Sequence, residues 1–87
     1  MTDIRPSILA IDDTPANLMV LAQALSSEFD LQLAKSGASG LDIARRTRPQ
    51  LILLDVMMPE MDGFETCRQI KADETLKDIP IVIITAL

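Results

Sequence analysis

Three aspartates follow apolar runs of this chain in a pattern that could bind a cation or accept a phosphoryl group. Residues 7–11 run into Asp12 and Asp13, and residues 51–54 run into Asp55. If both runs are neighbouring buried strands, three carboxylates meet at one edge of a sheet, where they repel one another unless one is protonated or a hard cation joins them. Mg²⁺ fits best, because it prefers oxygen ligands and is commonly held by one or two carboxylates. A carboxylate can also be the nucleophile that accepts a phosphoryl group.

The same residues also have a purely structural interpretation. Asp12 and Asp13 could cap a helix and Asp55 could begin a turn, since aspartate is common at both places. We favour a site because both groups end strongly apolar runs and Thr85 ends a third.

The pattern of apolar residues predicts four short strands. Residues 8–12 and 51–55 are the kind of run that forms a strand covered on both faces. Apolar and polar residues alternate over 29–33, which favours an edge strand with one wet face. Pro80 introduces a fourth apolar run over 81–85.

Three helices are predicted between these strands. Thr14 can cap the first, and Pro15 suits its first turn. The second is expected over 38–47 and the third over 64–72, followed by a polar connection over 73–79. Strands that alternate with helices predict one α/β domain over 1–87, a doubly wound parallel sheet with right-handed crossovers. In such sheets ligands bind beyond the carboxyl ends of the strands.

Composition excludes several other classes of site. Histidine is absent, which removes histidine acid–base chemistry and nearly all zinc sites, and one cysteine allows no internal disulfide. A net charge of −5 argues against nucleic-acid binding, and no apolar run could span a bilayer. The N-terminus does not resemble a signal peptide, so we expect a cytoplasmic protein. Arg45, Arg46 and Arg48 should mark a solvated helix end, and Cys67 should be a buried core thiol.

A family resemblance rests on three segments of the chain. Residues 51–65, LILLDVMMPEMDGFE, together with Asp12-Asp13 and the later Ile84-Thr85-Ala86, closely resemble the receiver domain of two-component response regulators. The resemblance implies a flavodoxin-like α/β fold and a phosphorylation switch, in which a sensor histidine kinase or phosphotransfer protein supplies the phosphoryl group. A receiver domain is a signalling module rather than an enzyme.

The resemblance also implies a role for each matching residue. Asp55 would be the phosphoacceptor, and Asp13 and Asp55 would bind Mg²⁺ directly, with Asp12 acting through water. Met57 would give its backbone carbonyl to the metal. Thr85 would be the switch hydroxyl that bonds to the phosphoryl group and draws its loop inward, which changes the surface that partners recognise.

The chain departs from the family pattern at its end. Receiver domains carry a fifth strand with a terminal lysine and further helices, whereas this sequence ends at Leu87 and its last lysine is Lys77. The strand over 81–84 is then expected to be an uncovered apolar edge, which invites pairing with another chain. We therefore expect a homo-oligomer, for example a segment-swapped dimer. The missing terminal lysine leaves an alternative function open, that of a receiver-like interaction module that is never phosphorylated.

Two further function classes are weaker. Phosphatases of the haloacid dehalogenase type also use an aspartyl nucleophile, but they place a second aspartate two residues later, where this chain has Met57. A nucleotide-binding Rossmann domain would need a glycine-rich turn after the first strand, and the only glycines are Gly37, Gly40 and Gly63.

Overall fold

The computed structural model describes residues 5–55 and 63–84, which form a parallel four-stranded sheet in the order β2-β1-β3-β4 with three helices. In chain order the elements are β1 (Ser7–Ile11), α1 (Pro15–Leu25), β2 (Asp30–Ala34), α2 (Gly37–Thr47), β3 (Leu51–Asp55), α3 (Gly63–Ala72) and β4 (Ile81–Ile84). The predicted α/β class and parallel sheet are therefore confirmed.

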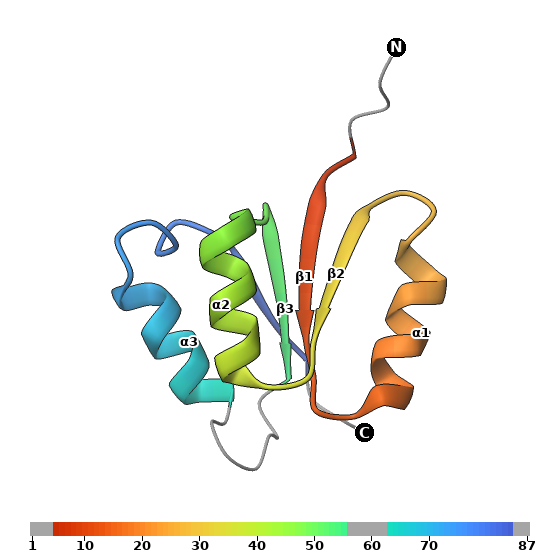
Figure 1. The fold of residues 1–87 in the computed structure, drawn as a ribbon, viewed down its shortest axis with the longest axis horizontal. Helices are drawn as coiled ribbons and strands as arrows, with labels where there is room; N and C mark the ends of the chain where they lie inside the picture. The colour runs from red at the N-terminus through yellow and green to blue at the C-terminus, as the bar shows by residue number, and fades with distance from the viewer. Residues whose placement is uncertain (1–4, 56–62, 85–87) are drawn as a thin grey trace.

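The helices lie on opposite faces of the sheet. In Figure 1, α1 covers one face beside β1 and β2, whereas α2 and α3 pack side by side on the other. Side chains alternate along a strand, so one half of each apolar run faces each layer. This explains why β1 and β3, the two central strands, are apolar along most of their length.

The main core lies between the sheet and the α2/α3 layer. Every second residue of β1 and β3 points into this core and meets the inward faces of the two helices. The buried cluster consists of Leu9, Ile11, Ala34, Leu41, Ala44, Ile52, Leu54, Ile70 and Leu76. Helix α2 approaches β1 closely at Gly40, where an added Cβ would lie 2.7 Å from Cγ1 of Ile11. The strand end that leads into Asp12 is thus firmly packed.

Helix α1 begins at Pro15, as predicted, but its cap differs from the expectation. Thr14 occupies the N-cap position, and its carbonyl accepts hydrogen bonds from the backbone N–H groups of Asn17 and Leu18, at 3.1 and 3.2 Å. Its side chain does not cap the helix; the hydroxyl instead lies 3.4 Å from Oδ1 of Asp13. The Ser36 side chain does cap α2, accepting from the N–H of Ser39.

Strand β2 is an edge strand, as predicted, but its wet face is not the expected one. Gln32 is half-buried and its Oε1 accepts from the Thr47 hydroxyl of α2 at 2.9 Å, whereas Leu33 is 40% exposed. The reason is that α1 does not close over this part of the strand. A cavity of about 230 Å³ remains between them, lined by Pro15, Leu18, Met19, Ala22, Leu33 and Lys35.

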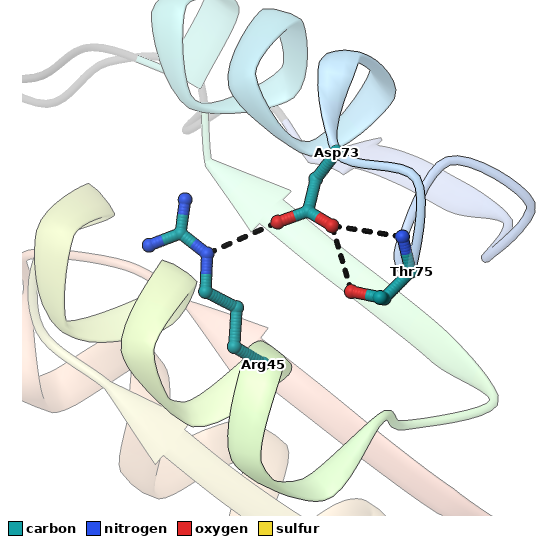
Figure 2. A network of polar contacts seen from close by, with 3 residues as sticks. All are labelled: Arg45, Asp73 and Thr75. Carbon is teal, nitrogen blue, oxygen red and sulfur yellow. Dashed lines mark hydrogen bonds and ion pairs between the residues drawn. The ribbon is translucent and has the colours of Figure 1, made fainter.

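The connection over 73–79, before β4, was expected to be polar, and this prediction is wrong at Leu76. Leu76 is fully buried and belongs to the core cluster. Figure 2 shows how the turn around it is held: the Asp73 carboxylate accepts from the backbone N–H and hydroxyl of Thr75, at 2.8 and 2.7 Å, and from Nε of Arg45 at 3.1 Å. These bonds lower the pKa of Asp73 to about 2.

Two smaller expectations can also be compared with the structure. Cys67 is half-buried against the core rather than fully buried. The arginines at the end of α2 are exposed, as expected, although Arg45 also forms the ion pair with Asp73 and Arg46 pairs with Asp42. Within residues 5–55 and 63–84, none of the helices has the length and apolar character needed to cross a membrane.

Candidate metal and phosphoacceptor site

The three aspartates lie at the point where the strand order reverses. From the central pair β1 and β3, the chain continues to β2 on one side and to β4 on the other. Asp12 directly follows β1, and Asp55 is the last residue of β3, so both stand at the carboxyl ends of adjacent strands. This is the position where parallel α/β sheets bind their ligands.

The structure brings the three predicted carboxylates together. One carboxylate oxygen from each of Asp12, Asp13 and Asp55 lies within 4.8 Å of the others. Asp12 and Asp55 are buried, at 4% and 3% exposed, whereas Asp13 is more accessible. The site is therefore a small acidic cluster with a buried floor and one side open to solvent.

Asp12 is fixed by hydrogen bonds from three directions. Its backbone N–H donates to the carbonyl of Ala34 at 3.0 Å, which extends the β1–β2 pairing past the end of the strand. Its Oδ1 accepts from the backbone N–H of Thr14 at 2.9 Å, and its Oδ2 accepts from the side-chain amide of Asn17 at 3.1 Å. The N-terminus of α1 lies beside these groups, and its positive dipole end stabilises a carboxylate there.

The chemistry of this donor set fits a hard divalent cation. All three groups are oxygen ligands on neighbouring positions, and two are removed from water, which makes their mutual repulsion costly. Among the described residues, no lysine or arginine forms an ion pair with Asp12 or Asp13. A Mg²⁺ ion would supply the missing positive charge and would keep several waters in its coordination shell.

Two predicted site residues fall outside the described part of the chain. Met57 lies in the segment 56–62, and Thr85 follows the last described residue of β4, so their roles stay predictions. Ile84, the residue before Thr85, is paired with Asp55 in the sheet register. The sequence analysis did not select Asn17. The available signal was its position, because it is an amide five residues after Asp12 in the first turns of a predicted helix.

Comparison with known proteins identifies the family. The family model for the response regulator receiver domain matches residues 8–87. The chain belongs to this family. The predicted receiver fold is confirmed by solved structures as well as by sequence.

Three similar proteins illustrate the relatives of this receiver domain. Response regulator PleD of Caulobacter vibrioides is 48% identical over 81 residues, which cover 92% of this chain and 18% of PleD. The N-terminal domain of a response regulator receiver protein from Methanoculleus marisnigri superposes with a TM-score of 0.89 at 39% identity, covering 93% of this chain and 67% of that one. The phosphorylated cyanobacterial phytochrome response regulator RcpA gives a TM-score of 0.87 at 29% identity, with 97% and 67% covered. The receiver domain described here thus spans about a fifth of its curated relative PleD.

Proposed function

We propose that this receiver domain is a phosphoacceptor, in which Asp55 receives a phosphoryl group from a sensor histidine kinase or phosphotransfer protein. The observation that carries the proposal is the meeting of Asp12, Asp13 and Asp55 within 4.8 Å at the β1/β3 carboxyl edge of a receiver fold. The phosphorylated state of the similar protein RcpA supports it.

The proposed roles follow from the position of each group. Asp55, at the end of a rigid central strand, presents its carboxylate as the nucleophile, and one of its oxygens bonds to phosphorus as the donor bond breaks. Asp13 and Asp55 would hold Mg²⁺ directly, together with the carbonyl of Met57, while Asp12 acts through water. When bound, the cation neutralises charge on the phosphoryl oxygens. Thr85 would then bond to the phosphoryl group and report its presence.

The decisive experiment is phosphorylation by a small donor. The chain is incubated with acetyl phosphate and MgCl₂, and its intact mass is measured. We expect a phosphoryl adduct that disappears in Asp55→Asn and remains in Asp78→Asn, an exposed aspartate at the opposite end of the sheet that serves as a matched control. An adduct that persists in Asp55→Asn would contradict the assignment. Absence of any adduct while Mg²⁺ still binds would favour the alternative module that is never phosphorylated.

We also propose that the 87-residue chain self-associates through β4. In the described sheet β4 is an edge strand, and Val82 and Ile83, on opposite faces of it, are 48% and 44% exposed. Exposed apolar edges pair readily with another strand. Light scattering should show an oligomer that Val82→Lys disrupts, whereas Val20→Lys, at a 64% exposed position on α1, should not. A stable monomer of the unmodified chain at micromolar concentration would refute this proposal.

A further inference from the structure

Asn17 is a residue outside the acidic cluster whose side chain donates a hydrogen bond to it. It lies on the first turn of α1, five residues after Asp12, and the residue as a whole is exposed to solvent. Its Nδ2 donates to Oδ2 of Asp12 at 3.1 Å. An ionised carboxylate only accepts hydrogen bonds, so the amide must present its nitrogen to Asp12.

We propose that Asn17 is a positioning residue of the acidic site, which fixes the orientation of the Asp12 carboxylate for Mg²⁺ binding. The proposal rests on the proposed function, because it concerns the same site. Asp12 has two oxygens, and each has a donor from α1 or its cap: Thr14 through its backbone and Asn17 through its side chain. The backbone bond alone would leave the carboxylate able to rotate about its side-chain torsion.

The second bond matters because Mg²⁺ tolerates little geometric freedom. It requires nearly octahedral coordination at short distances, whereas Ca²⁺ accepts six to eight oxygens in flexible arrangements. Asp12 would act on the ion through a water, so a carboxylate held at both oxygens would fix the place of that water for the stricter ion. Asn17 brings no charge, so it orients Asp12 without neutralising the negative cluster that attracts the cation. Groups that orient metal ligands in this way typically change metal affinity tenfold or more when they are removed.

The substitution Asn17→Ala removes the donor without weakening the helix. Alanine and leucine both have higher helix propensity than asparagine, so Asn17→Ala and Asn17→Leu should both fold. The matched control is Gln23→Ala, which removes an amide from an exposed position later in the same helix. The chain contains no tryptophan or tyrosine, so binding of MgCl₂ and CaCl₂ is measured by titration calorimetry, with circular dichroism to verify folding.

We expect Asn17→Ala and Asn17→Leu to weaken Mg²⁺ binding by about tenfold and Ca²⁺ binding by clearly less, with Gln23→Ala like the unmodified chain. A residue with a merely structural role would lower both affinities together. Equal losses for the two ions, or Mg²⁺ affinity within twofold of the unmodified chain, would overturn the positioning role while leaving the proposed function intact. Absence of Mg²⁺ binding by the unmodified chain would overturn both.

Discussion

Replacing Asp55 by asparagine should stabilise the metal-free protein while it abolishes the response to Mg²⁺. One carboxylate oxygen from each of Asp12, Asp13 and Asp55 lies within 4.8 Å of the other two. At 4.8 Å two unit charges repel by about 0.9 kcal/mol at the dielectric constant of water and about 3.5 kcal/mol at the effective value of 20 that suits sites near a protein surface.

The expected gain in unfolding free energy depends on which of these two repulsion energies applies to each pair of carboxylates. Asp55 faces two such neighbours. Asp13 is partly solvated, which favours the lower limit of about 0.9 kcal/mol for that pair, whereas Asp12 and Asp55 are both buried, which favours the upper limit of about 3.5 kcal/mol for theirs. Together the two pairs give roughly 4 kcal/mol of added unfolding free energy in Asp55→Asn. A domain of this size has a total unfolding free energy on the order of 4 to 13 kcal/mol, so the change is measurable.

The assay is urea unfolding followed by circular dichroism, with EDTA and then with excess MgCl₂. At a Mg²⁺ concentration a hundredfold above its dissociation constant, the unmodified chain should gain about 2.7 kcal/mol, whereas Asp55→Asn should gain little. Asp78→Asn changes the net charge equally but lies at the amino end of β4, so it should behave like the unmodified chain. A metal-free Asp55→Asn protein that is no more stable than Asp78→Asn would refute the repulsion argument.

Two further predictions concern the connection between α3 and β4. Leu76→Ala should lower the unfolding free energy by about 3 kcal/mol, because it removes a fully buried side chain. The control Leu33→Ala truncates a side chain that is 40% exposed and should cost less than about 1 kcal/mol. Equal losses for the two variants in urea unfolding would show that Leu76 is not in the core. The pKa of Asp73 falls from 3.8 to about 2 on folding, so its contribution to stability is complete above about pH 4 and is lost as the pH falls toward 2. Over that range the unmodified chain should lose more unfolding free energy than Asp73→Asn, and parallel pH profiles would contradict the bond network of Figure 2.

The parts of the fold that sequence reasoning predicted best are the buried central strands. The expected range 51–55 coincides with β3, and β1 begins and ends one residue before the expected 8–12. A strand covered on both faces must be apolar throughout, so its limits are visible where polar residues begin. The meeting of the aspartates followed from the same reasoning, because parallel strands place their carboxyl ends together.

The features that escaped prediction depend on packing between elements. The alternation of apolar and polar residues along β2 indicated that Leu33 shares a face with Leu31. It could not indicate that α1 leaves Leu33 at the rim of a cavity. Leu76 is the one fully buried residue of a stretch without helical or strand periodicity, and its burial depends on the turn held by Asp73 and Thr75. Predicting the hydrogen bond from Asn17 to Asp12 would likewise have required the orientation of α1 relative to Asp12.

The acidic cluster should lower the stability of the metal-free fold and thereby couple folding to the binding of a cation. Asp12 and Asp55 are almost fully buried, so each has lost most of the water that would otherwise stabilise its charge. The hydrogen bonds from Thr14 and Asn17 recover part of that loss for Asp12. A cation bound among the three carboxylates would relieve their mutual repulsion, and anything that binds the folded state alone stabilises it. The same proximity of Asp12 to Asp55 that destabilises the metal-free domain therefore supplies the free energy with which it would bind Mg²⁺.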